Sequence, residues 1–331
     1  MSIIPEILIN NGFEFKTLGP KHLDEIYGLI NNHYMEDQNH ITRLTFSKDF
    51  IYWYIKYIPT GFIVGLILNK KIVGMITALL IDMVINNNIV NIPYIDFLCI
   101  QTRIRGLGLA PLLIDELKNR LTKLNTKYAL YSDNKANRMF NYICQCQEFV
   151  IPINYSKLKN IGFLAEYLKP LPLSNNQLHL MTASDIDFII PKLNKSMEKN
   201  KIRPYFTNKN AHHFLLPKKN IVYSFVKKLN SEITDFVTVY KNYSYCLDHN
   251  KIISVAQLAF YYHETMELTE LIVELLGKLS TYGFDQLIFK NIHENMNIEL
   301  EKFPLCDKIN YHLSGAELDV IDPSHMNIYP F

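Results

Sequence analysis

The spacing of hydrophobic residues changes along the chain between the alternation typical of strands and the three-and-four spacing typical of helices. Residues 13–30 predict a short strand, a Gly-Pro turn and an amphipathic helix. Residues 178–193 predict the same order of strand, turn and helix, with hydrophobic residues at the same helical spacing. The beginning of the chain therefore has a counterpart near its middle.

A second pair of segments repeats in the same way, because residues 116–132 and residues 274–290 both predict a helix followed by a strand. Both pairs are separated by nearly the same number of residues, which an internal duplication would produce. Chance is the alternative, since strand–helix units are common. We interpret the chain as a duplicated one.

The remaining hydrophobic runs predict strands that meander between the helices, with "INNN" at 85–88 as a hairpin turn. This arrangement indicates a mixed α/β (α+β) fold. Pro170 and Pro172 deny a helix between the two parts, so we divide the chain into residues 1–168 and 169–331. The predicted strands lie at 61–69, 72–85, 89–100, 221–228, 234–241, 252–261 and 285–290.

Composition narrows the classes of protein. Of 331 residues, 48% are hydrophobic and the net charge is +2, values that favour a globular protein and argue against nucleic acid as a partner. No run of residues predicts a transmembrane helix or a secretory signal, so we expect a cytosolic protein, in the host cytosol if the source is a virus. The five cysteines are irregularly spaced; Cys144 and Cys146 have no second pair nearby, so we expect no metal.

The most informative stretch runs from Tyr94 to Leu121, where an apolar strand leads through a basic, glycine-bearing turn into a helix. Gly106 and Gly108 remove side chains where a backbone faces a ligand, and the helix N-terminus adds unpaired N–H groups and a positive dipole end. Such a turn suits a pyrophosphate. An ordinary strand–helix loop with glycines for tightness is the alternative at this point.

The turn has the spacing Arg105-Gly106-x-Gly108-x-Ala110, which resembles the acyl-CoA motif of the GNAT acetyltransferase superfamily. The flanking residues narrow the resemblance: "YIDFLCI" followed by "RIRGLGLAPLLIDELKNRL" is similar to the signature of the N-myristoyltransferase family. Further segments resemble the same family along most of the chain. They are "LINNHYMEDQN", "SKDFIYWYI", "EITDFVTVY" and "ELLGKLSTYGFDQLIF".

The resemblance implies a tandem GNAT-like fold with two pseudo-symmetric halves, the first binding acyl-CoA and the second binding peptide. It also implies an enzyme that transfers a myristoyl group from myristoyl-CoA to the amine of an N-terminal glycine. We expect glycine-initiated peptides as partners, no metal, and a monomer. Two alternatives remain: a general GNAT acetyltransferase, and an acyl-CoA- or peptide-binding protein with impaired catalysis.

By the same resemblance, the backbone N–H groups of Phe97 and Leu98 are oxyanion donors, and the α-carboxylate of Phe331 is the base that deprotonates the glycine. The residues implied for acyl-CoA binding are Phe97, Leu98, Cys99, Ile100, Arg105, Gly106, Leu107, Gly108, Leu109 and Ala110. The residues implied for peptide binding are Tyr34, Glu36, Asp37, Ser132, Tyr205 and His213.

Three departures from the family pattern bear on activity. Asp96 stands where the family usually has Asn, and an ionised Asp96 would place a negative charge beside the oxyanion. Gln38 replaces an acidic residue, which weakens the expected attraction for basic peptides. A family segment that folds over acyl-CoA has no counterpart among the first ten or so residues, so acyl-length selectivity stays open.

Overall fold

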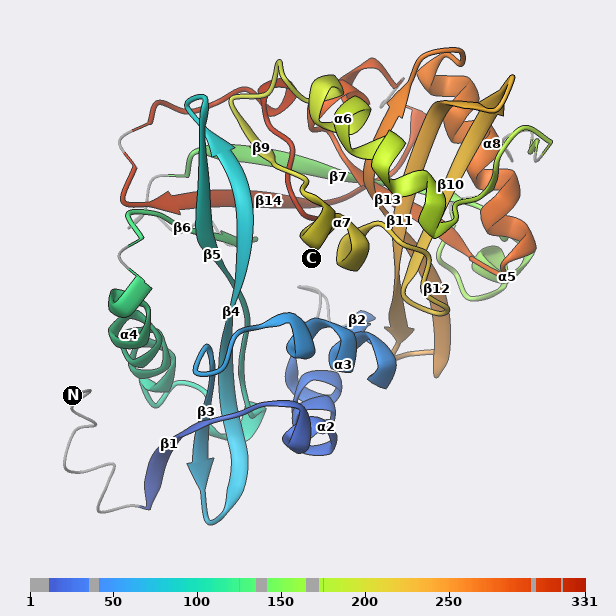
Figure 1. Ribbon diagram of the computed structural model, residues 1–331. Coiled ribbons are helices and arrows are strands. Elements are labelled where there is room, and N and C mark those ends of the chain that lie inside the picture. Colours follow the sequence, from blue (N-terminus) through green and yellow to red (C-terminus); the bar gives the residue numbers. More distant parts are fainter. Residues whose placement is uncertain are drawn as a thin grey trace. The chain divides into compact units, whose positions relative to one another are not determined.

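A computed structural model describes residues 12–35, 42–124, 126–134, 142–164, 173–174, 176–298, 302–316 and 318–331. These residues form two compact units, drawn in Figure 1. The first unit holds the described residues within 1–81, 91–132 and 311–317, and the second holds those within 82–90, 133–310 and 318–331. The predicted boundary between residues 168 and 169 lies outside the described residues.

The first unit is a sheet with helices packed on it. Its strands follow the order β1-β3-β4-β5-β6, with β1, β3 and β4 antiparallel and β5 parallel to β6. In Figure 1, α4 lies on one side of β3, β4 and β5, and α2 and α3 lie on the other. The elements are β1 (Phe13–Thr17), α2 (Leu23–His33), β2 (Thr42–Thr45), α3 (Lys48–Tyr57), β3 (Ile63–Leu68), β4 (Lys71–Ile85), β5 (Asn88–Ile100), α4 (Leu109–Leu121) and β6 (Ala129–Asp133). Residues 82–85 of β4, 88–90 of β5 and 133 of β6 belong to the second unit.

The second unit has a longer sheet in the order β7-β13-β12-β11-β10-β8, in which β12 and β13 are parallel. Its strands are β7 (Cys144–Pro152), β8 (His179–Leu180), β9 (Ile202–Pro204), β10 (Val222–Leu229), β11 (Glu232–Cys246), β12 (Lys251–His263) and β13 (Gln286–Lys290); β14 (Leu305–Ser314) has residues in both units. Its helices are α5 (Tyr155–Asn160), α6 (Ile186–Ser196), α7 (Asn208–Phe214) and α8 (Leu268–Thr281).

The same succession of elements occurs in both units, and this confirms the predicted tandem architecture. Three antiparallel strands lead into a helix and then into a strand parallel to the third: β3, β4, β5, α4 and β6 in one unit, and β10, β11, β12, α8 and β13 in the other. The first hairpin of each succession turns through two residues with positive φ, namely Asn69-Lys70 and Asn230-Ser231.

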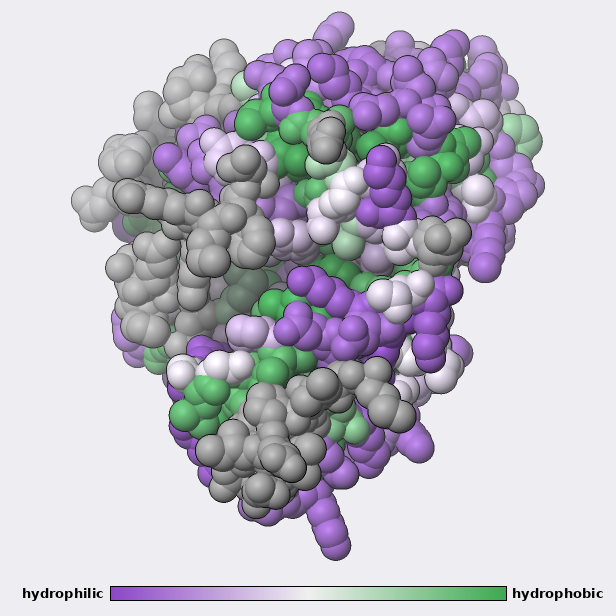
Figure 2. Space-filling model, turned by 90° about the vertical axis from the view of Figure 1, so that its left-hand side faces the viewer, coloured by the Kyte–Doolittle hydropathy of each residue, from purple (hydrophilic) through white to green (hydrophobic). Residues whose placement is uncertain are grey.

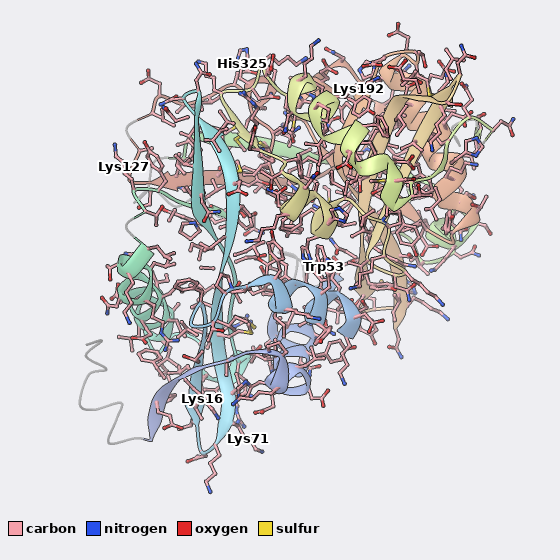
Figure 3. All side chains as sticks on the ribbon, viewed as in Figure 1. Lys16, Trp53, Lys71, Lys127, Lys192 and His325 are labelled. Atoms are coloured by element: carbon pink, nitrogen blue, oxygen red, sulfur yellow. The ribbon has the colours of Figure 1, made fainter. Side chains whose placement is uncertain are left out.

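Each unit buries its own hydrophobic core. In the first unit, α3 contributes Trp53, labelled in Figure 3, and α4 contributes a hydrophobic stripe that includes Leu113 and Leu117. In the second unit, Leu271 and Leu275 of α8 cluster with alternate residues of β10, β11 and β12. The middle of β11 is buried at successive positions, so both faces of this strand are covered, as α6 and α8 contact it.

The surface turned to the viewer in Figure 2 is mostly hydrophilic, with hydrophobic patches between the charged side chains. Exposed hydrophobic side chains include Leu107, which is 61% exposed, and Leu98, which is 39% exposed. Within the described parts of the chain, no helix has both the length and the hydrophobicity needed to cross a bilayer.

Candidate active site

Strand β5 has an irregularity at Phe97, where φ is +49°, a value that bulky residues rarely adopt. The burial pattern changes at the same place: residues 92–94 are all buried, residues 95 and 96 are half-buried, and burial then alternates at Phe97 and Cys99. This change of phase is typical of a bulge, in which one extra residue turns the backbone out of the regular ladder. The pairing with β6 is confined to Tyr94 and Ile95.

Asp96 lies at this irregularity and is enclosed by hydrogen-bond donors. Its carboxyl Oδ1 accepts the backbone N–H of Phe97 at 2.6 Å and the hydroxyl of Tyr34 at 3.1 Å. Its Oδ2 accepts the hydroxyl of Tyr54 at 3.2 Å, and its main-chain oxygen accepts the Thr77 hydroxyl at 2.9 Å. The predicted oxyanion donor Phe97 N–H is therefore engaged by the neighbouring side chain.

The surroundings of Asp96 are aromatic as well as polar. The Phe97 ring lies 5.2 Å from the Tyr34 ring and 5.0 Å from the Tyr54 ring. Burial raises the pKa of Asp96, while the hydrogen bonds from Phe97, Tyr34 and Tyr54 oppose this rise. Burial and the neighbouring Asp96 also raise the pKa of both tyrosines, so these hydroxyls stay protonated at neutral pH.

The turn after β5 presents backbone N–H groups that have no partner among the described residues. Gly106 has φ +83° and Gly108 has φ +71°, and open space lies where a Cβ would stand at either residue. The positive φ thus explains both glycines. No described residue accepts a hydrogen bond from the N–H groups of residues 106–110, which include the first residues of α4. A run of free N–H groups at a helix N-terminus is suited to an anion.

Arg105 fixes this turn through backbone carbonyls. Its Nε donates to the carbonyl oxygen of Ile100 at 3.0 Å, and its guanidinium also donates to the carbonyl oxygen of His33 at the end of α2. Burial raises the pKa of the Cys99 thiol to about 12, against the opposing positive charge of Arg105, so Cys99 is a protonated side chain of the strand.

The corresponding turn of the second unit, between β12 and α8, carries a carboxylate of the chain itself. Asp235 Oδ1 accepts the N–H groups of Glu264, Thr265 and Met266 at 3.0 to 3.1 Å. Burial raises the pKa of Asp235, but hydrogen bonds from Thr265, Thr234 and the backbone outweigh it and lower the pKa below 3.8. This turn therefore binds an internal anion.

Gly74 occupies the place of Asp235 in the first unit. Gly74 is the fourth residue of β4 and Asp235 is the fourth residue of β11, and each strand follows the equivalent two-residue turn. A Cβ on Gly74 would lie 3.4 Å from the carbonyl oxygen of Cys99, beside the end of β5. The first unit thus has no internal carboxylate at this position, and its turn, residues 101–108, is longer than the turn of residues 264–267.

The predicted peptide-binding residues are divided between the units. Tyr34 and Ser132 belong to the first unit, where Ser132 hydrogen-bonds the hydroxyl of Tyr94, two residues before Asp96. Tyr205 and His213 belong to the second unit. Glu36 and Asp37 lie outside the described residues.

In the second unit, Tyr205 is half-buried after β9, and its N–H donates to the carbonyl oxygen of Asp82 at 2.9 Å. His213 lies on α7 with its ring edge-to-face against Phe214, at a centroid distance of 4.8 Å. Burial, helped by the charge of Lys218, lowers the pKa of His213 to about 3, so this imidazole is neutral at physiological pH.

The last residues of the chain are packed into the second unit. The N–H of His293 donates to the Met326 carbonyl oxygen at 3.0 Å, and the N–H of Asn327 donates to the Ile202 carbonyl oxygen at 2.9 Å. Tyr329 is fully buried, and the Phe331 ring lies 5.2 Å from the ring of Tyr240. The Phe331 ring also stacks on Tyr329 at 5.5 Å. The end of the chain therefore has a defined position.

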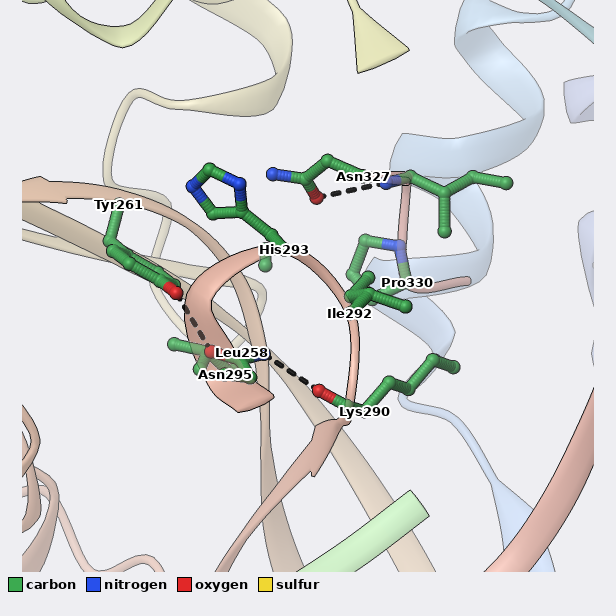
Figure 4. A pocket seen from close by; sticks show the side chains of 10 residues that line it. Leu258, Tyr261, Lys290, Ile292, His293, Asn295, Asn327 and Pro330 are labelled. Carbon is green, nitrogen blue, oxygen red and sulfur yellow. Dashed lines mark hydrogen bonds between the residues drawn. The ribbon is translucent and has the colours of Figure 1, made fainter. Parts of the chain in front are cut away.

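A small cavity lies under this terminal segment, with room for about one water molecule. It is lined by β12, by residues after β13 and by the segment from Asn327 to Pro330, as Figure 4 shows. Asn295 accepts the Tyr261 hydroxyl at 2.9 Å and donates to the Lys290 carbonyl oxygen at 2.7 Å. Neither ring nitrogen of the buried His293 has a hydrogen-bond partner among the described residues.

Comparisons with known proteins identify the family of this chain. Residues 5–146 match the sequence model of the Myristoyl-CoA:protein N-myristoyltransferase N-terminal domain, and residues 153–314 match that of the C-terminal domain. A protein of Acanthamoeba polyphaga mimivirus, provisionally named glycylpeptide N-tetradecanoyltransferase, is 47% identical over 324 residues, which cover 97% of this chain and 90% of that protein. The chain belongs to the N-myristoyltransferase family.

Solved structures agree with this membership at the level of the fold. Saccharomyces cerevisiae N-myristoyltransferase with bound myristoyl-CoA superposes with a TM-score of 0.84 at 20% identity, covering 96% of this chain and 87% of that one. A GCN5-related N-acetyltransferase of Anabaena variabilis superposes with a TM-score of 0.52 at 9% identity, covering 91% and 72%. The fold is therefore the tandem GNAT-like α/β fold of N-myristoyltransferases.

Several residues around the site were not anticipated by the sequence analysis. Tyr54 and Thr77 bind Asp96 from α3 and β4, and nothing in their local sequence indicates this. Asp235 could have been recognised from the sequence, because an acidic residue inside an apolar strand must find buried hydrogen-bond donors. Cys144 and Cys146 lie with their sulfurs 3.6 Å apart, and the described residues contain no group of three or more potential metal ligands.

Proposed function

We propose that this chain transfers a myristoyl group from myristoyl-CoA to the amine of an N-terminal glycine, through the residues named below. This is the reaction of the family to which the chain belongs. The observation that carries the proposal is the opened strand at Phe97, followed in the same unit by a turn whose N–H groups have no described partner. A thioester carbonyl and a pyrophosphate are the groups that such amides bind.

The turn holds the phosphates of acyl-CoA. The N–H groups of Gly106, Leu107, Gly108, Leu109 and Ala110 are directed at the anion, and Arg105 keeps the turn in place through the carbonyls that it binds. Cys99 and Ile100 line the path from the turn back to the strand opening. The proposal is supported by the second unit, where an equivalent turn binds the Asp235 carboxylate.

The backbone N–H groups of Phe97 and Leu98 stabilise the oxyanion that forms when the amine attacks the thioester carbonyl. Donors of this kind act most strongly when they are fixed in place before the reaction. The buried Phe97 ring, packed among Tyr34, Tyr54 and Phe46, fixes the backbone at this residue. The tetrahedral intermediate then expels the CoA thiolate.

The α-carboxylate of Phe331 accepts the proton of the glycine ammonium, whose pKa is near 8 before binding. Loss of this proton gives the neutral amine that attacks the thioester. The packed terminal segment and the aromatic contacts of Phe331 support this role, because a base must be held in one position.

The peptide contacts Tyr34, Ser132, Tyr205 and His213, with Glu36 and Asp37 attracting basic residues of the peptide. His213 acts as a neutral imidazole, in keeping with its lowered pKa. We further propose that the protein acts as a monomer in the cytosol, which is the host cytosol if the source is a virus like that of the mimivirus relative.

The test is an acyl-transfer assay with acetyl-, octanoyl- and myristoyl-CoA and an octapeptide that begins with glycine, read by the mass of the peptide. We expect a myristoylated product, and no product from the same peptide with an acetylated N-terminus. Equal use of acetyl-CoA, or product formed on the blocked peptide, would overturn the proposal.

A second candidate function is acyl-CoA or peptide binding with impaired catalysis. It is favoured by one observation, the engagement of the Phe97 N–H by the Asp96 carboxyl. In the same assay it predicts saturable binding of myristoyl-CoA without any change in peptide mass.

A further inference from the structure

The carboxyl group of Asp96 binds the Phe97 N–H, a donor that the proposed reaction needs for the oxyanion. Its Oδ1 lies 2.6 Å from the Phe97 nitrogen, a short distance typical of a charge-assisted hydrogen bond. An oxyanion on the same N–H would stand within a few ångströms of that carboxyl oxygen. If the carboxyl were ionised, two negative charges would share one donor, and the intermediate would be destabilised.

We propose that Asp96 is a positioning residue that gates the oxyanion donor: its ionised form holds the Phe97 N–H, and its protonated form releases that N–H to the substrate. This inference rests on the proposed function, since it assumes that the Phe97 N–H serves the oxyanion. The gate requires no covalent step, because only a proton is gained or lost by the carboxyl group.

Tyr34 and Tyr54 offer the Asp96 carboxyl group other hydrogen-bond donors besides Phe97. Both hydroxyls donate hydrogen bonds to the carboxyl group; Tyr34 lies at the end of α2 and Tyr54 lies in α3. These donors hold the carboxyl group when it no longer accepts from Phe97. Once protonated, the carboxyl also has an O–H of its own to donate, and a neutral aspartic acid beside an oxyanion is an established way to stabilise one.

The other titratable groups facing Asp96 keep their charge state near neutral pH. The pKa values of Tyr34, Tyr54 and Tyr94 are all raised by burial, and burial raises that of Cys99 to about 12. Thr77, which faces Asp96 from β4, does not ionise. Asp96 is thus the member of this described cluster whose charge changes, and burial moves its pKa toward the physiological range.

The direction in which the transfer rate changes with pH follows from the proposal that ionised Asp96 inhibits transfer. Transfer should slow as pH rises through the pKa of Asp96, whereas deprotonation of the glycine amine makes transfer faster as pH rises. The two effects together give a bell-shaped profile of kcat/KM. Above its alkaline midpoint, the rate should fall by about tenfold for each pH unit.

The test measures kcat/KM for peptide against pH in the wild type, in Asp96→Asn and in Tyr54→Phe. Asp96→Asn cannot ionise, so we expect the alkaline fall to disappear. Tyr54→Phe removes one donor to the ionised carboxyl and should move the fall to higher pH, which keeps the proposal testable if Asp96→Asn does not fold.

An alkaline fall that is unchanged in either folded variant would overturn the gate. So would Asp96→Asn activity that is reduced by the same factor at every pH, because that result indicates a purely structural role. Failure of the proposed function is distinguishable: the wild type would then form no myristoylated peptide at any pH, whether or not it binds myristoyl-CoA.

Discussion

The Asp235 carboxylate accepts the backbone N–H of Met266 at 3.1 Å, together with two neighbouring N–H groups, at the turn that leads into α8. The equivalent turn into α4 has the same kind of free amides, and Gly74 stands where Asp235 would. In the second unit, the turn that precedes the helix thus binds an internal anion. In the first unit, the N–H groups at the start of α4 have no hydrogen-bond acceptor among the described residues.

Gly74→Asp should close the open turn. The new carboxylate would reach the amides of the turn as Asp235 does in the second unit, and would repel the CoA phosphates. We expect the affinity for myristoyl-CoA to fall by about 100-fold, equivalent to about 2.7 kcal/mol. Isothermal titration calorimetry measures the change.

Gly74→Ala is the matched control for this variant. Its Cβ meets Leu113 Cδ1 at 3.2 Å and the Cys99 carbonyl oxygen at 3.4 Å, so it tests crowding without charge. We expect the alanine variant to bind within a few-fold of the wild type. Equal losses in the two variants would show that crowding, and not an internal anion, accounts for the effect.

Asp235→Ala should destabilise the protein, because it leaves three backbone amides without the buried carboxylate that accepts their hydrogen bonds. The expected loss in the free energy of unfolding is about 3 kcal/mol, measured by urea denaturation at pH 7. The folded-state pKa of Asp235 is lowered, so its stabilisation is present above pH 3.8 and is lost as pH falls further. A variant as stable as the wild type at pH 7 would contradict the stabilising role of Asp235 at this turn.

His293 should make stability depend on pH at mildly acidic values. Burial lowers its pKa from 6.5 to about 4, so protonation favours the unfolded chain. The free energy of unfolding should fall by up to about 3 kcal/mol as pH drops from 6.5 to 4. His293→Leu should lose this part of the pH dependence; if its unfolding curves shift with pH as much as those of the wild type, the prediction is wrong.

One extra residue after Phe331 should remove the base from its position. Extending the chain by a single glycine moves the terminal carboxylate by about 3.5 Å, which is enough to break a proton transfer. We expect kcat to fall by about 100-fold or more in stopped-flow assays, with the affinity for myristoyl-CoA unchanged. An extended chain that turns over at the wild-type rate would exclude the terminal carboxylate as the base.

The sequence predicted those parts of the fold that local patterns determine. The helix after the glycine-bearing turn and the hairpin turn at Asn86-Asn87 follow from spacing and residue type, and both asparagines have positive φ. Strand β14 was not predicted, because its first half is polar and exposed and its pairing depends on distant strands. Propensity alone does not contain that information.

At the site, the turn glycines and the importance of Asp96 could be predicted, but the geometry around them could not. A positive φ at Phe97 is disfavoured for that residue and persists only because distant aromatic rings hold it. The partners of Asp96 come from three elements far apart in sequence. The role of Gly74 emerges only when the two units are compared strand by strand.

The central claim is that backbone amides between Phe97 and Ala110 hold the acyl-CoA, and hydrogen–deuterium exchange with and without myristoyl-CoA tests it most directly. We predict slower exchange on ligand binding at residues 106–110 and at Phe97 and Leu98, with no comparable change at the turn of residues 264–266. Saturating myristoyl-CoA that leaves exchange at residues 97–110 unchanged would contradict the account.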